Sequence, residues 1–497
     1  MISKLKTFLF KNISPRQTIT KNIFWLSASQ IGTRIFRVII IIYAARILGA
    51  AEYGVFSYVL GFAGFFAAFA DIGINSLLTR DIAGHPEQRN SYFSTSFWIK
   101  MVLLFFTALL IALVAPHFSN IKEASFLIPF VALMVIFDGI GEFAIAFLRG
   151  MEKMQWEALI LSVENIALMV IGFIFLVISP TSKSLTFSYI ASSGLATLLA
   201  IFILRNQFSK IFRYFDKKLA YRTIKAALPI AFSTAMGVFM INNDMVMLGW
   251  WRTATEIGYY SVGQRIVPFL YILSSLFAGA IFPVLSRFAQ QNEKEKEKNL
   301  NEKSMASLFL VAIPLVVGGI ILAEPIIGLT FGQVYLPGVP AFRVLLATLL
   351  WIYPITFLSY LVLAHNQQKK IVKYAIICSL ANVLFNVLLI PVWGIIGAAI
   401  ATFVSQIFYV FPTWKYMKKF SDFKTLRHLK KIIVGAIIMG VVSFILNYFN
   451  VNVILNIIVS AGVYFGALYL FKEKVLGEVL ILFKKFQDAP SQSNNLN

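Results

Sequence analysis

The feature that most constrains this chain is a series of long apolar segments that recur from residue 22 to residue 472. A helix needs about 20 mostly apolar residues to cross the hydrocarbon core of a bilayer. Hydrophobic residues make up 59% of the chain and charged residues 13%, whereas about a quarter of the residues of a soluble chain are charged. The sequence therefore predicts an all-α polytopic membrane protein.

The apolar segments predict about fourteen transmembrane helices. We place them at 22–47, 54–79, 92–116, 124–148, 157–179, 184–205, 223–250, 256–286, 305–324, 338–364, 371–391, 393–414, 431–449 and 452–472. Basic residues gather in alternate connections, as in the cytoplasmic loops of membrane proteins. We expect a multi-pass protein of the cell (cytoplasmic or inner) membrane with both termini in the cytoplasm. The net charge of +22 then belongs to these loops, and we expect no nucleic-acid partner.

Two parts of the chain resemble each other. The segment LGAAEYGVFS at 48–57 is similar to LG at 248–249 followed by EIGYYS at 256–261. The offset corresponds to six spans, an even number, so both copies enter the membrane from the same side. This predicts two six-helix lobes in a parallel pseudo-twofold repeat, plus two C-terminal helices. Chance similarity between apolar helices is the alternative.

The predicted organisation follows from the spans and the repeat. It comprises a cytoplasmic leader at 1–21, an N-lobe at 22–208, a cytoplasmic linker at 209–222, a C-lobe at 223–418, two further helices within 431–472 and a cytoplasmic tail at 473–497.

Polar residues at membrane depth are the candidate functional residues, because a charge there costs several kcal/mol unless it faces a cavity or a partner. Gln30, Arg34 and Arg37 are spaced i, i+4 and i+7, so they share one face of the first span. Arg265 lies in the eighth span. We predict that these four residues bind the head group of a substrate.

A second group of polar residues is acidic or amidic. Asp71, Asn243 and Asp244 are candidates for coupling or gating, and further polar residues in the spans are Asp138, Glu142, Glu164 and Asn165. The alternative reading is structural: Arg34 or Arg37 would pair with Asp71, and Arg265 with Asp244, as ion pairs that lock the lobes.

The chemistry of these residues favours an anionic cargo. Guanidinium groups in a low-dielectric chamber bind phosphate strongly and bidentately. The sequence has no phosphate-binding G-x-x-x-x-G-K-[ST] loop, no H-E-x-x-H helix and no G-x-S-x-G elbow, and its four histidines are scattered. We therefore expect no catalytic residues, no metal site, no cofactor and no enzymatic activity.

Three segments carry a family resemblance. PVWGIIGAAIAT at 391–402, DMVMLG at 244–249 with EIGYYS at 256–261, and FLRGMEK at 147–153 resemble polysaccharide and O-antigen flippases. These proteins form a branch of the multidrug/oligosaccharidyl-lipid/polysaccharide exporter superfamily. The resemblance implies two six-helix lobes that rock between inward-open and outward-open states. The peptidoglycan-precursor branch of that superfamily has cavity arginines in its first and eighth spans. Arg34 and Arg265 of this chain resemble those arginines.

The resemblance also implies a function. Polyprenyl-diphosphate-linked oligosaccharide would move from the cytoplasmic to the outer leaflet by alternating access, for surface polysaccharide or glycan biosynthesis. The implied partners are that substrate, membrane lipid, and polysaccharide polymerase or ligase proteins. One alternative is a cation-coupled exporter of drugs or other small molecules, although the first span has arginines and no acid. A membrane scaffold for polysaccharide synthases is another, but it leaves the arginines unexplained.

Overall fold

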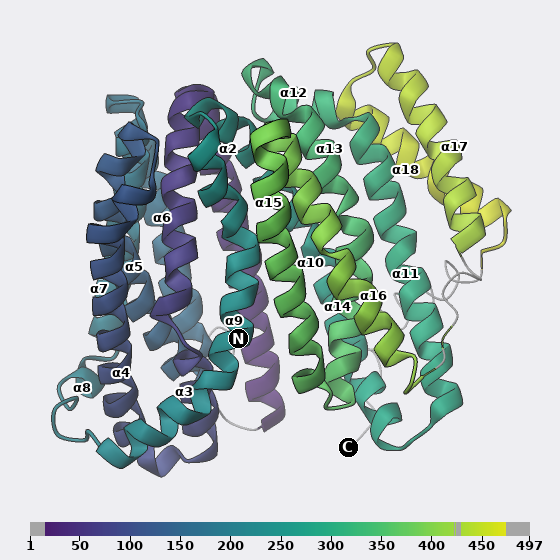
Figure 1. Cartoon of the computed structure of the whole chain (residues 1–497). Coiled ribbons are helices and arrows are strands. Elements are labelled where there is room, and N and C mark those ends of the chain that lie inside the picture. Colours follow the sequence, from purple (N-terminus) through teal and green to yellow (C-terminus); the bar gives the residue numbers. More distant parts are fainter. Residues whose placement is uncertain (1–14, 422, 424–428, 474–497) are drawn as a thin grey trace, which may run out of the picture. The chain divides into compact units, whose positions relative to one another are not determined.

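The structure is a computed structural model of the chain, and it describes residues 15–421, 423 and 429–473. Most of the predicted leader (1–14) and nearly all of the predicted tail (474–497) lie outside the described residues. Throughout the described residues the secondary structure is helical, with no strand, which confirms the all-α fold class (Figure 1). The chain divides into two compact units, Met1–Gly258 and Tyr259–Asn497.

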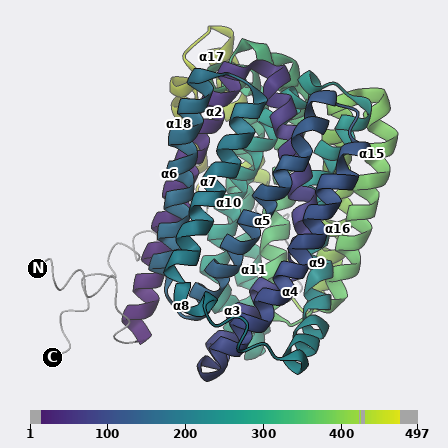
Figure 2. The ribbon, with the colours of Figure 1, turned by 90° about the vertical axis from the view of Figure 1, so that its left-hand side faces the viewer.

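Unit 1 contains the helices that form the candidate site. Its helices are α2 (Pro15–Ala70), α3 (Ile74–Gly84), α4 (Arg89–Leu109), α5 (Lys122–Gly150), α6 (Met154–Ile178), α7 (Ser182–Ile203), α8 (Arg205–Phe208) and α9 (Lys217–Trp251). The helix α6 packs against α7 and α2, and α5 also packs against both α7 and α2. Figure 2 shows α2, α5, α6 and α7 running side by side.

A glycine divides α2 into two segments. At about 1.5 Å per residue a straight helix of this length would far exceed the ~30 Å hydrocarbon core of a bilayer. Gly49 interrupts it with φ 70° and ψ 177°. Positive φ strains residues that carry a Cβ and costs glycine little. The break falls between the predicted first and second spans, 22–47 and 54–79.

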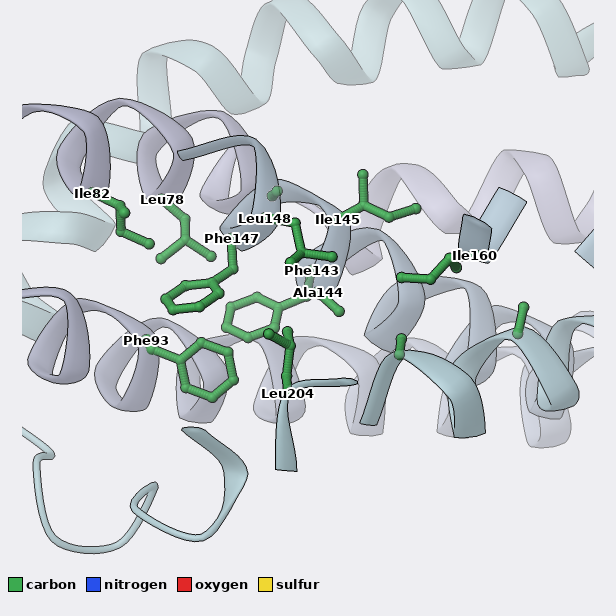
Figure 3. Close-up of a cluster of buried hydrophobic side chains, with 13 residues drawn as sticks. Leu78, Ile82, Phe93, Phe143, Ala144, Ile145, Phe147, Leu148, Ile160 and Leu204 are labelled. Carbon is green, nitrogen blue, oxygen red and sulfur yellow. The ribbon is translucent and has the colours of Figure 1, made fainter. Parts of the chain in front are cut away.

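The core of unit 1 is a cluster of aromatic and branched side chains (Figure 3). Phe93 of α4 lies edge-on to Phe147 of α5, with 4.7 Å between ring centroids, and also contacts Phe143 at 5.2 Å. Ile160 of α6 and Leu204, after α7, complete the contacts between the helices. All five side chains are at least 95% buried, so this cluster fixes how α4 to α7 pack.

Unit 2 has its own helices and its own core. Most of α10 (Ala254–Gln290) belongs to it, followed by α11 (Lys294–Ile321), α12 (Ala323–Thr330), α13 (Val339–Ala347), α14 (Leu349–Ala364), α15 (Gln368–Ser405), α16 (Ile407–Met417), α17 (Leu429–Tyr448) and α18 (Val453–Leu470). Gly394, with φ 57°, interrupts α15 at the start of the predicted twelfth span, 393–414. Tyr464 of α18 donates a hydrogen bond to the Leu310 carbonyl of α11 (2.8 Å), which fixes the C-terminal hairpin to this unit.

The described residues support a multi-pass membrane protein. Ten of their helices are long and apolar enough to cross a bilayer, or eleven if the bent pair formed by 32–70 and 74–84 is one span. The helical segment 368–417 is counted once among these ten, although the sequence predicts two spans there. The helix α9, where the sequence predicts the span 223–250, is not among the ten. The count of fourteen and the parallel arrangement of two lobes stay predictions.

Candidate functional site

The first span places Arg34 and Arg37 in a cavity of unit 1. The two residues are three positions apart on α2, so their side chains leave the same face of the helix. Both line a cavity of about 410 Å³ between α2, α5, α6 and α7. This volume lies in the range of about 300–1,000 Å³ that is typical of small-molecule sites.

The opposite walls of the cavity are rich in carboxylates. Asp138 and Glu142 are one turn apart on α5, and Glu164 and Asn165 are adjacent on α6. Hydroxyl groups come from α2 and α7, at Thr33, Ser193 and Thr197. Two guanidinium groups thus face three carboxyl groups. The sequence marks these acids as polar residues of the predicted spans, but no local pattern in it groups them with the arginines.

Arg37 already has an anionic partner. Its Nη2 donates to Glu164 Oε1 at 3.3 Å, and the two side chains are 48% and 23% exposed. The structural alternative in the sequence analysis paired Arg34 or Arg37 with Asp71, but the partner of Arg37 is Glu164. Asp71 Oδ1 instead accepts hydrogen bonds from Gly73 N (3.1 Å) and Asn75 N (3.4 Å), so it caps the start of α3.

Several acceptors in the cavity have unused capacity. Asp138 Oδ1 accepts a short hydrogen bond from Ser193 Oγ, which leaves Oδ2 for another donor. Asn165 Nδ2 donates to the Leu161 carbonyl (2.8 Å), whereas its buried Oδ1 has no hydrogen-bond partner in the described structure. Glu142 is exposed to the cavity and makes no hydrogen bond or ion pair with the described residues.

The hydrophobic core of unit 1 forms part of the cavity wall. Ile145, Ile160 and Ala196 belong both to the core cluster and to the cavity lining. Figure 3 shows Ile145 and Ile160 at the edge of that cluster. Because these side chains are close-packed, the helices that carry the polar groups are held at fixed spacing.

The cavity lies toward the end of unit 1 where α5 connects to α6. Glu142 is eight residues before Gly150, or about 12 Å along the helix. The connection is fixed by a bidentate ion pair, in which Arg149 Nε and Nη2 donate to Glu157 at 2.8 and 2.5 Å. The charge pattern predicts that this end faces the cytoplasm.

The remaining predicted residues lie elsewhere. Gln30 is on α2, but its side chain lies outside the described part of the structure. Asn243 and Asp244 are buried on α9, and neither they nor Asp71 line this cavity among the described residues. Arg265 is half-buried on α10 in unit 2. In the described part of the chain, no group of three or more His, Cys, Asp or Glu side chains is placed to hold a metal ion.

Comparison with known families gives two matches. The model of the family described as "Polysaccharide biosynthesis protein" matches residues 19–289, which include every residue of the cavity. The model of a second family, MatE, matches residues 229–392.

Relatives with curated descriptions resemble the chain over most of their length. "Probable low-salt glycan biosynthesis flippase Agl15" of Haloferax volcanii is 23% identical over 434 residues, covering 86% of this chain and 89% of the relative. "Capsular polysaccharide biosynthesis protein CapF" of Staphylococcus aureus is 21% identical over 419 residues, covering 81% of this chain and 100% of the relative.

Solved structures with the same fold are also membrane transporters. Lipid II flippase MurJ in an inward closed conformation has a TM-score of 0.74 and 20% identity, covering 91% of this chain and 100% of that chain. An inward-facing multidrug resistance MATE family transporter has a TM-score of 0.63 and 16% identity, covering 80% and 98%. At these identities the likeness shows the fold.

Proposed function

The chain belongs to the polysaccharide biosynthesis protein family, and from this premise we propose that it is a flippase for lipid-linked glycans. Its substrate is a polyprenyl-diphosphate-linked oligosaccharide, carried from the cytoplasmic to the outer leaflet of the cell membrane by alternating access. The relatives described as glycan flippase and capsular polysaccharide protein support this substrate class.

The observation that carries the proposal is the pair of arginines in a polar cavity. Arg34 and Arg37 line the cavity from one face of α2, within the predicted first span, where a charge is costly without a ligand or partner. A guanidinium group has five N–H donors in a planar fork that matches the oxygens of phosphate. Arg37 directs Nη2 to Glu164, so donors of the same guanidinium are left for a diphosphate.

In this mechanism the protein surrounds only the polar part of the substrate. The polyprenyl chain stays in the lipid, where it has no cost of transfer into water. An inside-negative membrane potential favours outward movement of each negative charge by about 2.3 kcal/mol per 100 mV. Arg265, Gln30 and the coupling candidates Asp71, Asn243 and Asp244 stay predictions in this scheme.

The test is transport in proteoliposomes. A fluorescent lipid-diphosphate sugar is placed in one leaflet, and its arrival in the other leaflet is followed by a membrane-impermeant quencher. Arg34→Ala with Arg37→Ala should slow the initial rate about tenfold or more, because charged hydrogen bonds to the substrate are lost. Arg80→Ala is the matched control, since Arg80 is exposed and pairs with its neighbour Asp81. Unchanged transport in the double variant would refute the assignment of the arginines.

A second candidate function, cation-coupled export of small molecules, is supported by the carboxylates Asp138, Glu142 and Glu164 and by the MatE match. Efflux of a cationic dye from the same proteoliposomes, driven by a Na⁺ or H⁺ gradient, tests it. Dye efflux without movement of the lipid-diphosphate sugar would favour this second function.

A further inference from the structure

We infer that the cavity of unit 1 is a sugar subsite, and that it accepts an uncharged, hydroxyl-rich sugar unit and disfavours a sugar that carries a carboxylate. This inference rests on the proposed function and specifies which head groups the flippase accepts. It is carried by the balance of donors and acceptors in the cavity wall.

The first step is the charge of the wall. Asp138, Glu142 and Glu164 bring three carboxyl groups, and Arg34 and Arg37 bring two guanidinium groups. Glu164 is paired with Arg37 at 3.3 Å, whereas the α5 acids make no ion pair in the described structure, and the nearest other cation to Glu142 is Lys100, which is buried on α4 behind the cavity wall. A carboxylate on the ligand would therefore meet like charges on α5.

The second step is the hydrogen-bonding capacity that remains. Asn165 Oδ1 is a buried acceptor without a partner, and Asp138 Oδ2 and both Glu142 oxygens have no donor among the described residues. Glu142 presents its oxygens directly to the cavity, and a donor that reached the buried Asn165 Oδ1 would remove a cost of about 1–3 kcal/mol. Phosphate and carboxylate ions offer only acceptors, whereas each sugar hydroxyl offers one donor and two acceptor lone pairs.

The third step is the arrangement of the two kinds of group. The arginines come from α2, and the acceptors with unused capacity come from α5 and α6. A diphosphate bound at the α2 wall would have its first sugar within reach of the α5 and α6 wall, because both walls enclose about 410 Å³. One head group can thus satisfy both walls, with its phosphates on the arginines and its hydroxyls on the acceptors.

Binding to the full-length protein in nanodiscs tests the inference. The probes are three fluorescent farnesyl diphosphates: one without sugar, one with glucose and one with glucuronic acid. The two sugar probes differ only at C6 of the sugar, where glucose has CH₂OH and glucuronic acid has COO⁻. We expect the glucose probe to bind about tenfold more tightly than the glucuronic acid probe. Glu142→Gln should reduce this ratio several-fold because it removes one repelling charge, while Glu87→Gln, at an exposed acid outside the cavity, should leave it unchanged.

A second variant tests the acceptors independently of charge. Asn165→Leu keeps the size of the side chain and removes Oδ1, so it should weaken binding of both sugar probes and spare the sugar-free probe. The ratio and the comparison with the sugar-free probe are measured within each variant, so they do not depend on how much protein folds.

The outcomes separate the two proposals. If the sugar-free probe binds through Arg34 and Arg37 but glucose and glucuronic acid bind equally, the sugar subsite is refuted and the flippase proposal stands. Tighter binding of the glucuronic acid probe than of the glucose probe also refutes the subsite. So does a result in which Glu142→Gln leaves the ratio of the two affinities unchanged and Asn165→Leu does not weaken binding of the sugar probes. If none of the three probes binds, the flippase proposal fails and the subsite fails with it.

Discussion

The ion pair between Arg37 and Glu164 makes a quantitative prediction about substrate binding. In the structure Glu164 occupies one side of the guanidinium group that we assign to the diphosphate, so the carboxylate and the substrate compete for Arg37. Glu164→Gln removes the charge of the competitor and keeps its shape and a carbonyl acceptor. We therefore expect tighter binding of a lipid diphosphate by the variant.

The expected size of the effect follows from the geometry. Two unit charges 3.3 Å apart attract each other by about 5 kcal/mol at an effective dielectric constant of about 20. Arg37 is 48% exposed, so solvent screens much of this energy, and fully exposed pairs contribute only about 0.2–1 kcal/mol. We therefore expect a net competition of about 1–2 kcal/mol for this half-exposed pair, which corresponds to about a tenfold gain in affinity.

The assay is equilibrium binding of sugar-free fluorescent farnesyl diphosphate to the protein in nanodiscs. The Arg37→Ala background is the control, because the gain from Glu164→Gln should disappear when the guanidinium group is absent. Equal or weaker binding by Glu164→Gln, or a gain that persists with Arg37→Ala, would show that Arg37 does not bind the diphosphate in competition with Glu164.

Three further predictions concern the fold and the topology. Gly258→Ala should lower stability by about 3 kcal/mol or more, because the added Cβ would lie 2.0 Å from the backbone oxygen of Ala50. Gly466→Ala is the control and should have no effect in the same thermal shift assay, since the space around Gly466 is open. Arg149→Ala should destabilise the protein by about 3–5 kcal/mol on denaturant titration, since it leaves the fully buried carboxylate of Glu157 unpaired. Replacing both residues with apolar ones should recover most of this loss. The orientation is tested in a background in which Cys378, the single cysteine, is replaced by Ala. There, Phe449→Cys should react with an impermeant maleimide in intact cells, and Arg213→Cys should react only after permeabilisation. The reverse pattern would overturn the predicted orientation.

The membrane class and the all-α fold could be predicted because they depend on local properties of the chain. The length of an apolar segment decides whether it can cross a bilayer, and that length is visible in the sequence. The interruption of α2 at Gly49 and of α15 at Gly394 is likewise local, since both breaks occur where the sequence predicts one span to end and the next to begin. The spacing of Arg34 and Arg37 fixed their common face for the same reason.

The composition of the cavity could not be predicted in this way. Glu164 lies 127 residues from Arg37 in sequence, and no local pattern indicates that α6 brings its carboxylate to α2. Asp71 was a plausible partner because it lies in the next predicted span, but it caps α3 instead. The sequence therefore determined the helical class and which side chains share a helix face. Only the packing of α2 against α5, α6 and α7 decided which charges meet, because contacts between helices depend on side-chain fit over the whole unit.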